Sequence, residues 1–231
     1  MNPEDLDGEQ KERMAAIGMN VGYLLHQVRS PVTTIGMLAH SIRKKADLEG
    51  PNREKMDQLL QQVSDLEDML QECMDYVRPP SGEGARVNVP NLLRWTAEQV
   101  QPQAEKRDVS LEVDAPRDVP SVCGHLRLLR QALLNVVENA VEAAAEGKRL
   151  VSLSAHATSQ RVVIEVADTG TGLSEEETER VFEPFYTTKK QGSGLGLAFV
   201  RKVVEDHGGR AEVKSRPGQG TTVALRLPKA Q

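Results

Sequence analysis

Residues 125–147 read HLRLLRQALLNVVENAVEAAAEG, and they set two amide side chains inside a strongly helical pattern. Leucine, valine and alanine recur at helical spacing and Gly147 ends the run, which predicts one long helix. Asn135 and Asn139 are four residues apart, so both project from one face of that helix. Carbonyl oxygens at this spacing can hold a hydrated Mg²⁺ and contact phosphates. Alone, the pair does not decide between a ligand site and ordinary packing.

The residues around this helix predict an α+β sandwich. Short alternating stretches predict strands, and two further amphipathic stretches predict helices. The predicted strands are 86–89, 109–113, 150–157, 161–168, 210–215 and 221–228, and the predicted helices are 90–101 and 198–209. Helices segregated from a largely antiparallel sheet give this fold class.

DTGTG at 168–172 follows a predicted strand and combines a carboxylate with two glycines. Asp168 could accept a hydrogen bond from an exocyclic amine such as that of adenine. Gly170 and Gly172 would let the backbone approach a flat ligand closely. Taken alone, the stretch is better explained as a plain turn.

GSGLGL at 192–197 leads into a predicted helix, where free backbone N–H groups could cradle an anion. It is not a Walker loop, because no GK[ST] follows, and it does not come directly off a strand, so the dinucleotide fingerprint fails. The preceding stretch, FEPFYTTKKQ at 182–191, is too polar for a core and is typical of a mobile lid whose lysines could meet phosphates.

The first third of the chain predicts a helical hairpin. Apolar residues step by three and four over 17–42 and again over 56–77, on either side of the turn signal DLEGPN at 47–52. A single hairpin cannot enclose such a stripe, so we expect two copies to form a homodimeric four-helix bundle. RPPSGEGA at 78–85 is a linker by composition. The expected domains are 1–80 and 86–231, joined by a linker at 81–85.

YLLHQVRSP at 23–31 places a histidine inside the first predicted helix. His26 lies two residues from Leu24 and two from Val28, which puts it off the apolar stripe and predicts that it is exposed. By itself an exposed helical histidine usually has no function.

Composition excludes several classes of protein. The 231 residues carry a net charge of −5, which argues against nucleic acid as the main partner. No apolar run approaches the roughly 20 residues that a membrane span needs, and the polar N-terminus is no signal peptide. Cys73 and Cys123 lack metal-type spacing, so we expect two buried or half-buried thiols in a reducing, cytoplasmic compartment.

Each motif is ambiguous, but their order is informative. The series N-x-x-x-N, D-x-G-x-G, F-x-P-F-x-T-T-K, G-x-G-L-G-L and G-x-G-T (218–221) resembles the ATP-binding domain of sensor histidine kinases over residues 86–228. The stretch LLHQVRSP then resembles the phosphoacceptor box of that family, and residues 10–78 its dimerisation hairpin. The segment before the box is similar to soluble nitrogen-regulation-type and flagellar-regulation-type kinases. The implied fold is a dimeric helical hairpin followed by a GHKL (Bergerat-type) ATP-binding sandwich.

The resemblance implies a role for each motif. His26 would attack the γ-phosphorus of ATP, and the phosphoryl group would pass to an aspartate of a response-regulator receiver domain. Asn139 would coordinate Mg²⁺, with Asn135 on the phosphate side, and Asp168 would accept the adenine amine. The remaining implied nucleotide-binding residues are Gly170, Gly172, Phe182, Phe185, Thr188, Lys189, Gly192, Gly194, Leu195, Gly196 and Thr221.

At several positions the residue in this chain differs from the one usual in the proteins it resembles. Gyrase-type and chaperone-type ATPases carry Glu at the position of Asn135, and an amide cannot activate water by taking its proton. Gln27 follows the histidine where the family usually has an acid, so it could orient His26 but not act as its base. Ser30 stands where Asn or Thr often positions a water for dephosphorylating the regulator. Glu142 lies where a basic residue is common.

Two other functions remain open at this point. One is a phosphotransfer scaffold with a degenerate ATP domain, although such proteins usually lose the glycine motifs. The other is a GHKL ATPase or serine kinase, which the histidine box and Asn135 oppose. Because few residues precede the hairpin, we expect either a separate sensor protein as a partner or a longer chain.

Overall fold

The computed structural model describes residues 25, 27–44, 50–77, 84–189 and 192–230 of the chain. The chain divides into two compact units. The first comprises Met1–Pro79 with Lys189–Ser193, and the second comprises Pro80–Thr188 with Gly194–Gln231. Among the described residues, no helix has both the length and the apolar character that crossing a membrane requires.

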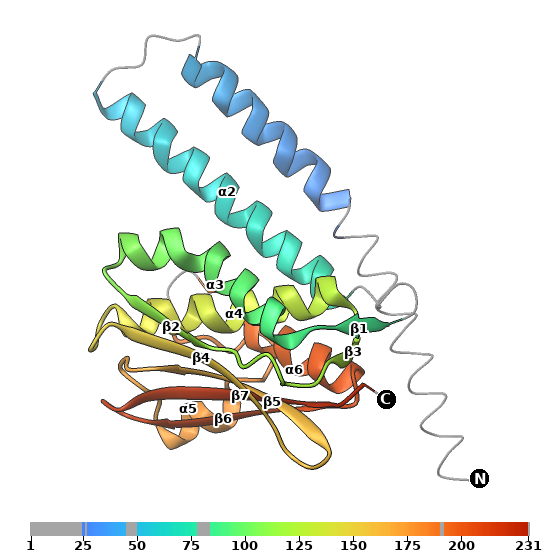
Figure 1. The fold of residues 1–231 in the computed structure, drawn as a ribbon. Helices are drawn as coiled ribbons and strands as arrows, with labels where there is room; N and C mark the ends of the chain where they lie inside the picture. Colours follow the sequence, from blue (N-terminus) through green and yellow to red (C-terminus); the bar gives the residue numbers. More distant parts are fainter. Residues whose placement is uncertain (1–24, 26, 45–49, 78–83, 190–191, 231) are drawn as a thin grey trace, which may run out of the picture. The chain divides into compact units, whose positions relative to one another are not determined.

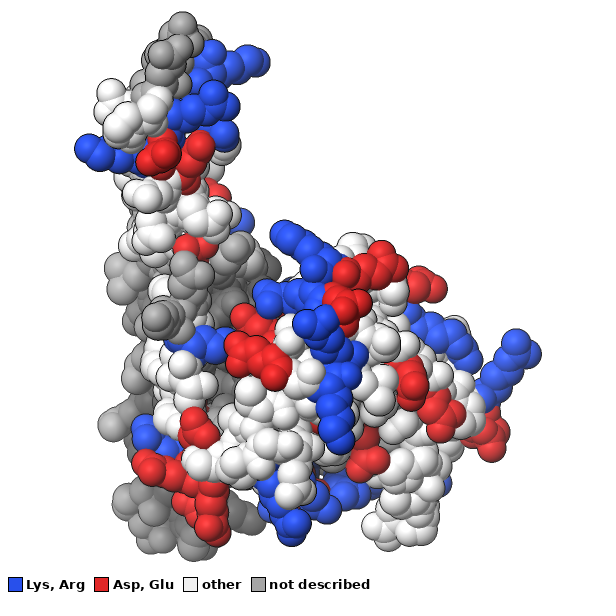
Figure 2. All heavy atoms as spheres, turned by 90° about the vertical axis from the view of Figure 1, so that its left-hand side faces the viewer, with Lys and Arg blue, Asp and Glu red and all other residues white. Residues whose placement is uncertain are grey.

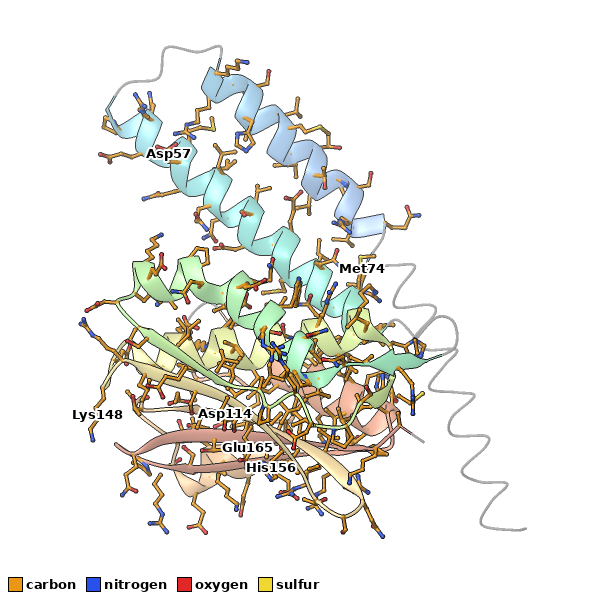
Figure 3. All side chains as sticks on the ribbon, in the orientation of Figure 1. Asp57, Met74, Asp114, Lys148, His156 and Glu165 are labelled. Carbon is orange, nitrogen blue, oxygen red and sulfur yellow. The ribbon has the colours of Figure 1, made fainter. Side chains whose placement is uncertain are left out.

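In the first unit, a helix over 27–44 lies antiparallel to α2 (Pro51–Val77), which confirms the predicted hairpin (Figure 1). Polar contacts tie the two helices together at both ends. Arg29 Nη1 donates to Gln71 Oε1 (2.9 Å) at one end. Arg43 pairs with Asp57 (2.9 Å) near the start of α2, far along that helix from Met74 (Figure 3).

The two faces of the first helix differ in burial. Val32 and Ala39 are buried at 6% and 5% exposure, and a Cβ on Gly36 would lie only 3.1 Å from Val63 Cγ1. Small side chains here allow the helices to approach closely. The predicted apolar stripe points elsewhere and stays exposed, at Val28, Ile35, Leu38 and Ile42 (47–59%). The hairpin therefore closes on one face and leaves a second apolar face uncovered within the chain.

The second unit is an α+β sandwich, as predicted. β1 (Ala85–Val87) pairs with β3 (Val122–Gly124), and a five-stranded sheet has the order β2-β4-β5-β7-β6. Only β2 and β4 run parallel within that sheet, as far as the described strands go. The sheet strands are β2 (Ser110–Asp114), β4 (Leu150–Ala157), β5 (Arg161–Asp168), β6 (Arg210–Arg216) and β7 (Gly220–Pro228). The helices are α3 (Val89–Lys106), α4 (Leu126–Ala144), α5 (Glu175–Arg180) and α6 (Gly196–Asp206).

Helices α3, α4 and α6 cover one face of the five-stranded sheet (Figure 1). Leu129 and Leu133 of α4 meet inward-facing strand residues such as Leu153 and Ile164, all at most 2% exposed. Alternating positions of β4 are buried and half-buried, as expected for a strand with one face on a core. This core holds α4, and with it the two asparagines, rigidly over the sheet.

A histidine joins the start of α4 to the end of α6. The Nδ1 atom of His207 lies 2.6 Å from the Val203 carbonyl oxygen, and Nε2 accepts from the backbone N–H of His125 (2.9 Å). A Cβ on Gly124 would lie 2.3 Å from the His207 ring, so only glycine fits there. The contact fixes where α6 ends relative to α4.

Three local predictions missed or misjudged a feature. The predicted elements omit the three-residue strand β3 and the six-residue helix α5, which begins with a capping box between Ser174 and Glu177. The S-x-x-E spacing of that box was readable from the sequence. Cys73 is half-buried as expected, but Cys123 is exposed, so the burial prediction was wrong for that thiol. It lies in β3, where its side chain is exposed.

Candidate functional site

The antiparallel pairing of β5 with β7 brings two distant glycine motifs together. Ala167 lies opposite Thr222 in the register, so the end of β5 meets the start of β7. The DTGTG loop therefore leaves the sheet beside the turn that precedes β7. Residues about fifty positions apart in the chain share one edge of the sheet.

Asp168 is held at this edge by backbone donors. Its side chain is buried, with 9% exposure, and Oδ1 accepts from the N–H groups of Gly170 (2.8 Å) and Thr221 (3.2 Å). No hydrogen bond to Oδ2 occurs within the described part of the chain. Burial raises the pKa of Asp168 above its ordinary value, and the two amide donors offset only part of that rise. One oxygen is thus fixed, and the other is left to a ligand.

Glycines make the close approach of the two loops possible. A Cβ on Gly220 would lie 2.0 Å from the Asp168 carbonyl oxygen, and one on Gly172 would lie 2.0 Å from that of Arg216. Both glycines also have positive φ, at 86° and 67°. The N–H of Gly218 donates to the Thr171 carbonyl (2.6 Å). Any other residue at Gly172 or Gly220 would push the β6–β7 turn off the DTGTG loop.

The two predicted asparagines lie half-buried on α4. Asn135 Oδ1 accepts from Gln131 Nε2 (3.0 Å), and its Nδ2 donates to the Gly196 carbonyl (3.3 Å). The Asn135 amide therefore ties α4 to the first residue of α6, where G-x-G-L-G-L ends. Gln131, which orients this amide, was missed from the sequence because a glutamine on a helix carries no distinctive signal.

Asn139 lies one turn further along α4 and is also half-buried, with polar contacts of its own. No group of three or more His, Cys, Asp or Glu side chains among the described residues could hold a metal ion. Mg²⁺ commonly takes one or two protein oxygens and completes its shell with phosphate oxygens and water. An amide oxygen on this helix fits a Mg²⁺ that arrives with a nucleotide.

At the base of the segment predicted to be a lid, a backbone contact joins Phe185 to Gly194. The Phe185 N–H donates to the Gly194 carbonyl (3.0 Å), and a Cβ on Gly194 would lie 2.4 Å from the Phe185 carbonyl carbon. Both residues have positive φ, at 66° and 71°. Phe182 is half-buried, whereas Phe185 is 73% exposed and Thr188 is exposed. A large apolar side chain in a left-handed conformation with its ring in solvent is a costly arrangement.

The other predicted site residues belong partly to the first compact unit and partly to the second. Leu195 is buried at the start of α6, whereas Gln27 and Ser30 are exposed on the first helix. Lys189 and Gly192 belong to the first compact unit, in which the Gly192 N–H donates to the Lys189 carbonyl (3.5 Å). His26 lies outside the described residues, as do two lid positions, 190 and 191.

Charges of both signs are mixed over the face of the second unit seen in Figure 2. Arg149, which follows Lys148 at the edge labelled in Figure 3, pairs with Asp108 across the start of β2. Exposed pairs of this kind contribute little to stability.

Comparison with known proteins assigns the family. Residues 124–231 match the family model described as histidine kinase-, DNA gyrase B-, and HSP90-like ATPase. The catalytic domain of the histidine kinase ThkA is 30% identical, with a TM-score of 0.58 over 64% of this chain and 97% of that domain. The chain belongs to the sensor histidine kinase family. Asp168 and Thr221, which the pairing of β5 with β7 brings together, thus lie in the part of the chain that matches a histidine kinase catalytic domain.

Longer histidine kinases match most of the chain. Sensor histidine kinase ZraS of Escherichia coli (strain K12) is 30% identical over 220 residues, which are 95% of this chain and 47% of ZraS. Full-length ShkA in complex with AMPPNP is 29% identical, with a TM-score of 0.77 over 92% of this chain and 46% of ShkA. ThkA in complex with the response regulator protein TrrA is 25% identical, with a TM-score of 0.69 over 98% of this chain and 66% of ThkA. The chain spans about half the length of the curated histidine kinases it matches.

Replacing Asp168 with Asn should leave the protein at least as stable as wild type and should weaken nucleotide binding if the base is bound at this edge. The pKa of Asp168 is higher in the folded state than in the unfolded state, so its neutral form is favoured by folding. The contribution of this carboxyl group to the free energy of unfolding is greatest below about pH 3.8 and is lost as the pH rises through the folded-state pKa. We expect Asp168→Asn to be at least as stable as wild type at neutral pH. Losing a charged acceptor should weaken ADP binding by about tenfold or more.

Urea unfolding over a range of pH, together with calorimetric titration of ADP, would measure both effects. Asp108→Asn is the matched control, since it removes an exposed carboxylate paired with Arg149 and should leave ADP affinity unchanged. If Asp168→Asn is less stable than wild type at neutral pH, then burial of the charged Asp168 carboxylate does not destabilise the fold.

A methyl group at Gly194 should open the base of the lid. Gly194→Ala would place Cβ against the Phe185 backbone at positive φ, which breaks the contact between Phe185 and Gly194. Gly218→Ala is the control, because its φ of 73° is equally strained but nothing lies within 4 Å of the added carbon. We expect faster proteolysis at 182–189 in Gly194→Ala than in Gly218→Ala, measured at equal folded fraction. Equal cleavage of both variants would show that the contact does not hold the lid.

Proposed function

We propose that the chain is an ATP-dependent protein histidine kinase that autophosphorylates His26 and passes the phosphoryl group to a response-regulator aspartate in two-component signalling. The observation that carries this proposal is the sheet edge at Asp168, which leaves one carboxylate oxygen beside glycine-lined backbone in a histidine kinase fold. A helical hairpin bearing the histidine box lies in the same chain.

The base of ATP binds at the edge formed by Asp168, Gly170, Gly172 and Thr221. Asp168 Oδ2 accepts the adenine amine, because Oδ1 is already saturated by two backbone donors. The two glycines leave room for a flat ring against the backbone. An amine donor at Oδ2 would favour the charged carboxylate and so oppose the rise in the pKa of Asp168 that burial causes.

The phosphates lie toward α4 and the start of α6. Asn139 supplies an oxygen to Mg²⁺, which neutralises phosphate charge when it is bound with ATP. Gly194, Leu195 and Gly196 present backbone N–H groups at the beginning of α6. The lid closes over the γ-phosphate with Thr188, Lys189 and Gly192. Phe182 and Phe185 anchor this lid. Positioning and charge neutralisation are the main tasks of a protein in such a transfer.

The Asn135 amide favours phosphorylation of a protein over hydrolysis of ATP. Its oxygen accepts from Gln131 and its nitrogen donates to Gly196, so both ends are engaged in holding α6. An amide cannot take a proton from water in any case. Without a base at this position, the neutral imidazole of His26 is the better nucleophile for the γ-phosphorus.

Gln27 orients His26 and leaves its proton to water, whereas Ser30 could hold a water for dephosphorylating the regulator. Both are exposed on the first helix and so are open to a partner. The crystal structure of ThkA with a response regulator supports a receiver domain as that partner. In this proposal the kinase acts in the cytoplasm and receives its signal from a separate sensor protein.

The kinase acts as a homodimer through residues 1–80, joined at 81–85 to the catalytic domain at 86–231. Val28, Ile35, Leu38 and Ile42 are about half-exposed and line one face of the first helix. Leu59 and Leu66 of α2 are exposed at 42% and 41%. An apolar stripe of this length on both helices is what a second hairpin would cover in a four-helix bundle.

A charge in this stripe should separate the dimer. Ile35→Asp places a carboxylate where the second hairpin would pack, so we expect a monomer at micromolar concentration. Met37→Asp is the control, because Met37 is 61% exposed on a different face of the same helix and should leave the dimer intact. Sedimentation equilibrium would give the masses. A monomeric wild type, or dissociation by both substitutions alike, would overturn the proposed interface.

Labelling with γ-labelled ATP and Mg²⁺ tests the reaction itself. We expect acid-labile label on the wild-type protein and none on His26→Ala, because a phosphoramidate hydrolyses in acid. His40→Ala is the matched control, since His40 is exposed on the same helix and should not affect labelling. Unlabelled wild type that nevertheless binds ATP would favour a scaffold. Equal label on His26→Ala would show that another residue accepts the phosphoryl group.

A further inference from the structure

Ser215, near the end of β6, makes three hydrogen bonds through one hydroxyl group. Its Oγ donates to the Gly220 carbonyl (2.9 Å), accepts from the Leu173 N–H (2.8 Å) and lies 2.8 Å from Thr221 Oγ1. Leu173 follows the DTGTG loop, whereas Gly220 and Thr221 begin β7. One half-buried side chain thus joins both glycine motifs of the nucleotide site.

The bonding pattern sets the polarity of the Thr221 hydroxyl. A serine hydroxyl has one hydrogen and two lone pairs. Because its hydrogen goes to Gly220, Ser215 can only accept from Thr221. The Thr221 hydrogen must therefore point at Ser215, which leaves Thr221 Oγ1 with lone pairs alone for any further partner.

Thr221 lies against the carboxyl group that is proposed to read the base. Its backbone N–H donates to Asp168 Oδ1, and Asp168 Oδ2 has no described hydrogen bond. The edge consequently offers two acceptors, Asp168 Oδ2 and Thr221 Oγ1, and the Thr221 hydroxyl is not available there as a donor. Two acceptors suit an amino group, as in adenine, and repel a carbonyl oxygen at the same position, as in guanine.

We propose that Ser215 is a positioning residue that determines base specificity: by accepting the Thr221 hydroxyl hydrogen, it keeps that hydroxyl an acceptor and so excludes guanine. This inference rests on the proposed function, because it concerns the same nucleotide site. A Thr221 hydroxyl released from Ser215 can rotate and donate to the guanine carbonyl oxygen. Loss of Ser215 should therefore relax discrimination as well as weaken binding.

A purely structural role makes a different prediction. Removing Ser215 also leaves the Leu173 N–H without its acceptor, which could loosen the loop and lower affinity for every nucleotide. The ratio of the dissociation constants for GDP and ADP separates the two roles. Loosening lowers both affinities together, whereas a change of hydroxyl polarity changes their ratio.

Calorimetric titration of the full chain with ADP and GDP in the presence of Mg²⁺ would measure this ratio. We expect wild type to prefer ADP, and Ser215→Ala to lower the preference by about tenfold. Ser215→Thr keeps the hydroxyl group and should retain the preference for ADP. Ser154→Ala is the matched control, because Ser154 is a half-buried serine of β4, away from the nucleotide motifs.

Thr221→Val provides a second route if Ser215→Ala does not fold. It removes the hydroxyl in question while the Ser215 bonds to Leu173 and Gly220 remain, and it should also lower the preference for ADP. A wild type that binds both nucleotides equally, or an unchanged ratio in folded Ser215→Ala and Thr221→Val, would overturn the inference and leave the proposed function intact. A wild type that binds neither nucleotide would instead overturn the proposed function.

Discussion

The pairing of β5 with β7 is the constraint on which the catalytic unit depends. It sets the end of one strand beside the beginning of another, so that a carboxylate and a glycine turn meet although about fifty residues separate them. Thr221 N–H then fixes one oxygen of Asp168 and leaves the other open. A shift of one residue in this register would turn every side chain of β7 to the opposite face. The buried apolar residues of the sheet therefore specify the geometry of the polar site.

The site also shows where stability and ligand binding oppose each other. Asp168 is buried enough that its pKa rises despite two backbone donors, so its charge destabilises the fold at neutral pH. Gly172, Gly194 and Gly220 have left-handed backbones in places where a side chain would collide. These features make little sense for packing alone. They are consistent with a surface shaped to accept a flat ligand with a polar edge.

Much of this arrangement could be predicted from the sequence, and the exceptions have physical causes. Period-two patterns gave β4 and β5 to the residue, and helical patterns gave α4 and α6 to within three residues at each end, because one face of each packs on a single core. The motif order indicated Asp168 and Thr221. It did not indicate that Ser215 bonds to Thr221 or that Gln131 orients Asn135. A serine in a strand and a glutamine on a helix have many ordinary roles. Their partners here, Gly220 and Asn135, are set by strand register and helix packing, which no local pattern encodes.

The first helix of the hairpin carries two different apolar faces, one packed on α2 and one exposed. Val32, Gly36 and Ala39 face α2 with small volumes, so the two helices approach closely and need little apolar area to do so. The larger Ile35, Leu38 and Ile42 are left on a separate face, where their exposure would be costly in a monomer. Sequence periodicity detects the larger residues first, because they dominate any hydrophobic pattern. It therefore predicted the exposed stripe, whereas the packed face of Val32, Gly36 and Ala39 depends on how closely the two helices approach, which no local pattern encodes.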